Sequence, residues 1–178
     1  MVGRRSVAVA LSSLVLTGSS LVWAPAAQTH TGAERGVVCT GTNDSHYDPP
    51  LTLAPRTVHV RAQARYTCTV APGRTVPATG SLDVTAPGSA CVALTHAGGT
   101  EVVHYADGGR SLIVYGGSAT TRAAGVLVTR LWGRVTEGRG AGLPARRTVI
   151  TLPGQLPTDC LTSGLRGNSS PVQLEVHP

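Results

Sequence analysis

Two histidines and a glutamate in the middle of the chain could bind a metal ion. His96 and His104 lie on either side of Glu101, in or beside two short apolar segments. If these segments are neighbouring strands, the two imidazoles can face each other, and imidazole and carboxylate groups are zinc ligands. The same residues also suit exposed positions of a sheet that binds nothing, so the sequence leaves both interpretations open.

The polar segment 43–48 is a second candidate metal site. Asp44 and Asp48 supply carboxylate oxygens, which are the ligands that Ca²⁺ prefers. Their spacing lacks the regular alternation of a calcium-binding loop, and such residues are also common turn formers. We therefore expect a polar surface loop here, with calcium binding as the alternative.

Catalysis is not indicated by any pattern in the chain. The G-x-S-x-G signature of serine hydrolases is absent, and the 9 acidic residues show no spacing that suggests a glycosidase pair. The sequence therefore predicts no catalytic residue and no cofactor.

The four cysteines are Cys39, Cys68, Cys91 and Cys160. An even number of cysteines in an exported chain predicts two disulfides. Zinc binding is the rival interpretation, but the chain has no C-x-x-C and no Cys/His pair at zinc spacing. Three connectivities are compatible with this count.

The elements that must position these side chains are β-strands. Over residues 57–70, apolar or small side chains at even positions alternate with polar ones at odd positions, a period typical of a strand with one buried face. Asp107-Gly108 predicts a hairpin turn. Further strands are expected at 82–86, 91–95, 102–105, 111–115, 125–135, 147–152 and 172–176. Trp132 is expected in the core. Eight or nine strands favour an antiparallel β-sandwich of immunoglobulin-like or related topology.

The amino-terminal region is typical of a secretory signal. Arg4 and Arg5 precede an apolar run, and Ala26 and Ala27 offer cleavage sites. The run is about half the length that a membrane-spanning helix needs. No cysteine stands at the cleavage site for a lipid anchor, and no sortase-type anchor ends the chain. We expect a signal over 1–26, a disordered leader over 27–36, one domain over 37–178, no stable membrane anchor, and release outside the cell.

The composition narrows the class of partner. The chain has 15 basic residues, all of them arginine, and a net charge of +6, or +4 once Arg4 and Arg5 are discounted. A positive surface favours anionic cell-wall polymers. The arginines are dispersed, without a basic run or a set of stacking aromatics, so nucleic acid is not an expected partner.

Several blocks resemble an uncharacterised family of small secreted actinobacterial (Streptomyces-like) proteins. The blocks cover 39–42, 47–56, 66–68, the hairpin 105–111, the glycine-rich segment 133–142 and the closing segment 160–176. The resemblance implies a β-sandwich with Cys39 paired to Cys68 and Cys91 paired to Cys160, and it implies no activity. Tyr105 stands where the family pattern usually has tryptophan, and Gly140 stands where it has an aromatic residue.

We therefore predict a secreted, non-catalytic β-sandwich protein that binds or structures something outside the cell. Its partner would be an anionic wall polymer or another extracellular protein. A secreted protease inhibitor, with reactive loops at 71–80 or 137–147, is the alternative. A secreted hydrolase is the third candidate.

Overall fold

A computed structural model describes residues 36–152 and 158–178 of the chain. The expected signal over 1–26 and the expected leader up to residue 35 lie outside the described residues. Within the described residues, eight strands and one short 3-10 helix, η2 (Thr158–Leu161), follow one another. The strands are β1 (Val37–Leu51), β2 (Arg56–Ala71), β3 (Arg74–Ser89), β4 (Gly98–Tyr105), β5 (Arg110–Ala123), β6 (Val126–Gly138), β7 (Pro144–Thr151) and β8 (Leu165–Val176). In the described part of the chain, no helix has the length and hydrophobicity to cross a membrane.

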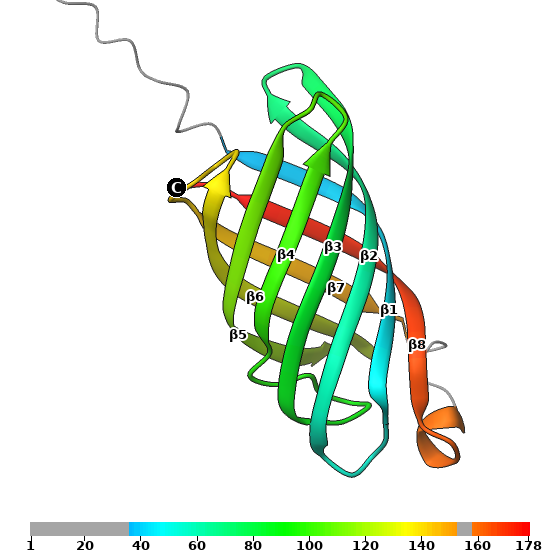
Figure 1. Cartoon of the computed structure of the whole chain (residues 1–178). Coiled ribbons are helices and arrows are strands. Elements are labelled where there is room, and N and C mark those ends of the chain that lie inside the picture. Colours follow the sequence, from blue (N-terminus) through cyan, green and yellow to red (C-terminus); the bar gives the residue numbers. More distant parts are fainter. Residues whose placement is uncertain (1–35, 153–157) are drawn as a thin grey trace, which may run out of the picture.

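The eight strands close into one antiparallel barrel (Figure 1). Each strand pairs with the next in sequence, and β8 pairs with β1 from Val37↔Val176 to Leu51↔Leu165. The expected β-sandwich of immunoglobulin-like topology is therefore wrong, although the all-β antiparallel class is confirmed. A period of two places alternate side chains inside both a sandwich and a barrel, so the pattern along single strands does not distinguish them.

The long alternating segment 57–70 is the centre of β2, as predicted. Its even-numbered side chains from Val58 to Val70 are buried inside the barrel, and most of its odd-numbered ones are exposed. The same alternation continues along β3, which pairs with β2 over nearly its whole length. Apolar side chains from all eight strands fill the interior and make one core.

Three local expectations are wrong. Residues 43–48, expected as a loop, lie within β1 and pair with both β2 and β8. Residues 91–95, expected as a strand, belong to the loop between β3 and β4. Trp132 lies on the outside of β6, where it is 49% exposed and covers Gly117.

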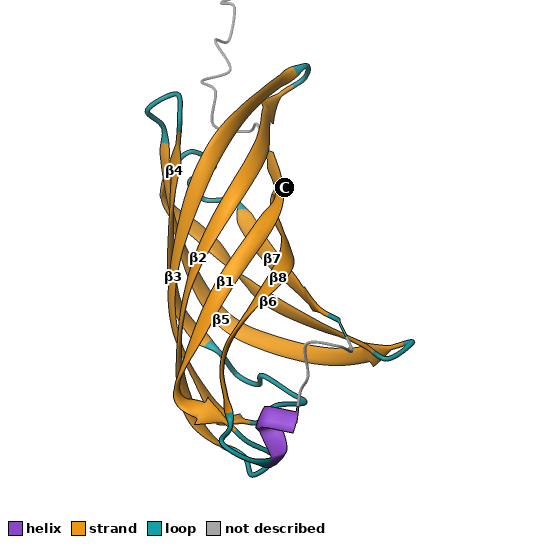
Figure 2. Ribbon diagram, turned by 90° about the vertical axis from the view of Figure 1, so that its right-hand side faces the viewer, coloured by secondary structure: helices purple, strands orange, loops and turns teal. Residues whose placement is uncertain are grey.

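The barrel has two different ends (Figure 2). The tight turns β2–β3, β4–β5 and β6–β7 form the hairpin end. The connections 52–55, 90–97 and 124–125 and the described residues 158–164 form the opposite end, here called the loop end, where η2 lies. The disulfide Cys91–Cys160 links the β3–β4 loop to η2 at the loop end, whereas Cys39–Cys68 joins β1 to β2. Both pairings agree with those that the resemblance implied.

An ion-pair cluster fastens the hairpin end. Arg139, in the β6–β7 turn, donates to the carboxylate of Asp107 in the β4–β5 turn at 2.8 and 3.0 Å and lies 4.4 Å from the ring centre of Tyr105. Ser111 donates to the carbonyl of Arg139 at 2.7 Å and bonds the Tyr105 hydroxyl at 3.1 Å. The predicted Asp-Gly hairpin turn is confirmed. The segments 105–111 and 133–142 are in direct contact at this end of the barrel.

Candidate functional site

The barrel separates the two histidines from Glu101. On β4, Glu101 and Tyr105 point into the barrel, while His104 points outward and is exposed. His96 is exposed in the loop at the loop end. No group of three or more histidine, cysteine, aspartate or glutamate residues that could hold a metal ion occurs in the parts of the chain that the structure describes.

The two aspartates of β1 also point away from the interior. Asp44 and Asp48 are both exposed on the outer face of the strand. Four residues of extended chain separate their Cα atoms by roughly 13 Å, so they do not converge on one ion. Asp44 instead forms an ion pair with Arg65 of β2 at 2.9 Å.

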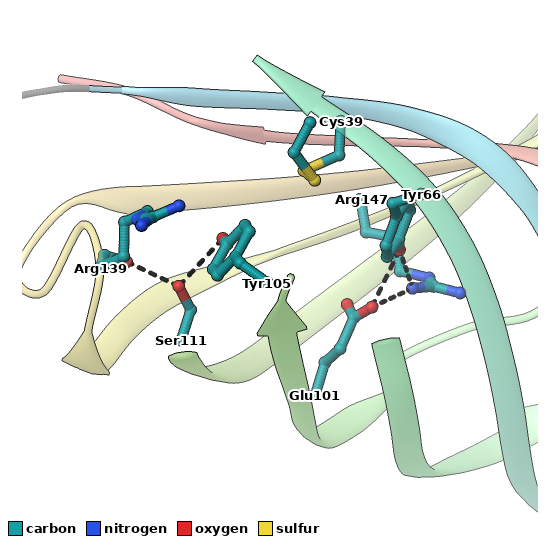
Figure 3. The surroundings of a disulfide bond; sticks show 8 residues. Cys39, Tyr66, Glu101, Tyr105, Ser111, Arg139 and Arg147 are labelled. Atoms are coloured by element: carbon teal, nitrogen blue, oxygen red, sulfur yellow. Dashed lines mark hydrogen bonds and ion pairs between the residues drawn. A yellow bond between two sulfur atoms is a disulfide. The ribbon is translucent and has the colours of Figure 1, made fainter. Parts of the chain in front are cut away.

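A charged network lies inside the barrel and was not predicted. Arg147 of β7 and Glu101 of β4 form an ion pair in which both side chains are fully buried. Tyr66 donates to one Glu101 oxygen at 2.9 Å, and Tyr115 donates to the other at 2.7 Å. Figure 3 shows Tyr66, Glu101 and Arg147 pointing toward one another beneath the Cys39 disulfide. The network joins β2, β4, β5 and β7 across the interior.

Arg147 also bonds to β1. Its Nη1 donates to Glu101 and to the Tyr66 hydroxyl, and its Nη2 donates to Oδ1 of Asn43. Its Nε is buried and has no hydrogen-bond partner among the described residues. A buried donor that loses water without gaining a partner costs about 1–3 kcal/mol.

The buried carboxylate sets the protonation of its neighbours. Burial would lower the pKa of Arg147, but the Glu101 carboxylate and the two tyrosines outweigh that effect, so the pKa is raised. Burial, and then the charge of Glu101, raise the pKa of Tyr66 and of Tyr115 well above the ordinary value. The arginine therefore stays charged, and both phenols stay neutral donors at ordinary pH.

A cavity of about 70 Å³ lies beside this network, toward the loop end. Its walls are mainly apolar, with a smaller polar side to which Arg147 belongs. The apolar lining consists of Leu51, Val60, Leu82, Ala90, Cys91, Ala93, Leu94, Leu127, Leu131, Val149 and Leu165. The polar lining consists of Asn43, Ser45, Tyr47, Thr120, Thr129, Arg147, Thr151 and Asn168.

The polar wall groups bond mainly to one another. Tyr47 donates to Oδ1 of Asn168 at 2.7 Å, and Nδ2 of Asn43 donates to the Ser45 hydroxyl at 2.7 Å. Burial raises the pKa of Tyr47 to about 12, despite the opposing effect of a hydrogen bond to Ser45, so its hydroxyl remains protonated. Of the polar residues that line the described cavity, only Arg147 has a buried side-chain atom without a partner.

The β3–β4 loop forms one wall of the cavity and is held from β5. The Thr120 hydroxyl accepts from the Leu94 N–H at 3.0 Å and donates to its carbonyl at 3.1 Å. The Ser118 hydroxyl accepts from the Ala97 N–H at 2.9 Å. Together with Cys91–Cys160, these bonds hold the loop across the loop end.

One signal in the sequence could have revealed the network. In the alternation of a strand, Glu101 falls on the same face as the apolar Val103 and Tyr105, and Arg147 falls on the same face as Ala145 and Val149. A charged residue on the apolar face of a strand needs a buried partner of opposite charge.

Compared with protein-family models, curated proteins and solved structures, the chain shows no match.

Proposed function

We propose that this chain is a secreted, non-catalytic binding protein that takes a small, mainly apolar molecule into the loop-end cavity of its barrel. The observation that carries the proposal is the cavity itself, which has a mainly apolar lining with a smaller polar side and lies at the loop end of the barrel.

The size and lining of the cavity support a small ligand. A water molecule needs roughly 10–15 Å³ of such space, so a cavity of about 70 Å³ has room for several waters or one compact molecule. Pockets for small molecules combine apolar walls with a few placed polar groups. An engineered apolar cavity of roughly 150 Å³ binds benzene and xenon, and the cavity here is smaller, so its ligand must be compact.

The lining also favours binding over catalysis. Among the described lining residues there is no histidine, aspartate, glutamate or lysine, and Cys91 is held in a disulfide. General acid–base or nucleophilic chemistry needs such groups within hydrogen-bond reach of each other. The buried Glu101 is occupied by three donors, and its role is to neutralise Arg147.

Methyl NMR tests the proposal with benzene as the probe. We expect benzene to shift the methyl signals of Leu82 and Leu131, which line the cavity. Val149→Phe fills the cavity and should abolish these shifts, whereas Val114→Phe, on the outer wall, should preserve them. Unchanged Leu82 and Leu131 signals at saturating benzene would refute cavity binding.

A second candidate function concerns the outer wall. The exposed Trp132 lies between Arg130 and Arg134 of β6 and pairs across the sheet with Arg146 of β7. This grouping supports the expected attraction to anionic wall polymers. Soluble polyphosphate should quench Trp132 fluorescence, and Arg130→Gln should weaken that effect more than Arg61→Gln on the distant β2 does.

The inhibitor alternative gains less support from the fold. β3 begins at Arg74 and β7 begins at Pro144, so most of 71–80 is strand and the β6–β7 connection is a short turn fastened by Arg139. A reactive loop of the expected kind needs an extended exposed segment, and neither region provides one.

A further inference from the structure

The exposed indole of Trp132 rests on a flat seat that the neighbouring strand provides. A Cβ on Gly117 of β5, which pairs with Trp132, would lie 2.6, 2.7 and 2.8 Å from Nε1, Cε2 and Cζ2 of the indole. Three neighbouring ring atoms at nearly equal distances show that a face of the indole, and not its rim, is turned toward Gly117. The pairing of β5 with β6 also shifts in register between Tyr115 and Gly117, an irregularity of the kind that re-aims a side chain. The indole thus lies against the barrel wall, and the residue is 49% exposed.

Three exposed arginines surround this indole and its seat, here called the Trp132 platform. Arg130 and Arg134 stand two residues away on the same face of β6, roughly 7 Å along the strand, and Arg146 of β7 pairs directly with Trp132. Arg134 donates to a backbone carbonyl of the β6–β7 turn, which leaves its charge uncompensated. Arg146 lies 3.9 Å from the partly exposed Glu175, a weak surface pair. Three arginines and one glutamate give this part of the wall a net charge of +2.

This arrangement suits a ligand with a flat apolar face and negative charges at its edge. A β-linked glucopyranose ring presents C–H groups on both faces, because its hydroxyls are equatorial, and tryptophan offers such a face a large rigid apolar surface. A uronic acid adds one carboxylate to each ring, and guanidinium groups bind carboxylates well. Single-stranded nucleic acid instead needs several aromatic side chains on which successive bases stack, and among the described residues Trp132 is the one exposed aromatic.

We propose that the Trp132 platform binds a uronic-acid polysaccharide, with one sugar ring stacked on the indole and neighbouring carboxylates paired with Arg130 and Arg134. A sugar ring with its glycosidic oxygen is comparable in length to two residues of a strand, so carboxylates on either side come within reach of these long side chains. Gly117 is a positioning residue that provides the flat seat of the indole. This inference rests on the second function proposed above, the attraction of the outer wall to anionic polymers, and it names the class of polymer.

Two trisaccharides of matched shape test the inference. The β-1,4-linked glucuronate trimer and cellotriose have the same rings and linkages and differ at C6, a carboxylate in the first and a hydroxymethyl group in the second. In NMR titrations at pH 7 that follow the amide signals of β6, the glucuronate trimer should bind at least about threefold more tightly, because one exposed ion pair contributes up to about fivefold. Arg130→Gln should remove most of this difference, whereas Arg61→Gln, on the opposite side of the barrel, should leave it unchanged.

The seat provides variants that leave the charge of the platform unchanged. Trp132→Leu should weaken binding of the glucuronate trimer at least about tenfold, since tenfold corresponds to the burial of only about 55 Å² of apolar surface. Gly117→Ala places a methyl group within 2.8 Å of three indole atoms and displaces the ring, so it should weaken binding at least about threefold. Its matched control is Gly116→Ala, where a Cβ meets nothing within 4 Å, and it should bind like the wild-type protein. If Gly117→Ala does not fold, Trp132→Leu at its exposed position decides the question.

Polyphosphate separates stacking from charge, because it has no ring to stack and should bind Trp132→Leu as it binds the wild-type protein. If polyphosphate binds, but the glucuronate trimer binds no more tightly than cellotriose or is unaffected by Trp132→Leu, this inference is overturned while the attraction to anionic polymers stands. Tighter binding of a thymidine trinucleotide than of the glucuronate trimer would also overturn it. If neither polyphosphate nor the glucuronate trimer binds, the outer-wall function itself is overturned, and this inference falls with it.

Discussion

The buried pair Glu101–Arg147 allows a quantitative test by a double-mutant cycle. Both side chains are fully buried, so their charges interact away from solvent. At an effective dielectric constant of about 20 and a charge separation of roughly 4 Å, the attraction is about 4 kcal/mol. Removing one partner of a buried pair costs about 3–5 kcal/mol, since the other charge is left uncompensated. Glu101→Gln and Arg147→Met should therefore each lower the free energy of unfolding by about 4 kcal/mol.

The double variant should lose no more stability than either single variant. With a coupling of about 4 kcal/mol, two single costs of about 4 kcal/mol combine to roughly 4 kcal/mol instead of 8. Urea unfolding at pH 7, with both disulfides intact, measures all four corners of the cycle. The exposed pair Asp44–Arg65, with a distance of 2.9 Å, is the control and should show a coupling below about 1 kcal/mol. Additive costs at Glu101 and Arg147 would refute the buried ion pair.

Three further changes test the packing, the loop end and the hairpin end. Gly133→Ala should destabilise the barrel by about 1–3 kcal/mol or more, because a Cβ there would lie 2.0 Å from a backbone oxygen of β5. The control is Gly116→Ala, where a Cβ meets nothing within 4 Å, and it should leave the urea midpoint nearly unchanged. Replacing Cys91 and Cys160 by alanine opens a loop with a sequence separation of 69 and should cost about 4 kcal/mol by loop entropy; it should also weaken benzene binding, which loss of the β1–β2 disulfide should not. Hydrogen bonds from Arg139 and from the Gly109 N–H lower the pKa of Asp107 from its ordinary value of 3.8. The ionised carboxylate therefore stabilises the folded protein fully above pH 3.8, and this stabilisation is lost as the pH falls through the lowered pKa of the folded state. Asp107→Asn should flatten this part of the acid unfolding profile, and an unchanged profile would contradict the assignment.

The strands were predictable wherever one face is buried and the other wet. In β2 the alternation runs from Val58 to Val70 without interruption, because every second side chain meets the core. The hairpin turn at Asp107 was predictable from its local turn chemistry. β1 was missed since its inward residues Asn43, Ser45 and Tyr47 are polar or amphipathic, so its central part has no apolar period.

Closure and the interior network depend on contacts between distant residues. The pairing of β1 with β8 joins the first and last strands in sequence order, and no local sequence pattern specifies that pairing. Glu101 and Arg147 are far apart in sequence. The alternation of each strand places the charge on the apolar face, but it does not identify the partner of that charge. Their partnership becomes visible only when the barrel brings β4 and β7 to face each other.

The seam between β1 and β8 also constrains the order of folding. Hairpins such as β2–β3 join residues close in sequence and can form early, but the seam brings Val37 against Val176. Closing a longer loop costs more chain entropy, and contacts between distant residues slow folding. The first strand must therefore wait, with one edge unpaired, until the last strand arrives. During that interval the edge is open to pairing with another chain, so the kinetics of closure set how long the nascent barrel is exposed to aggregation.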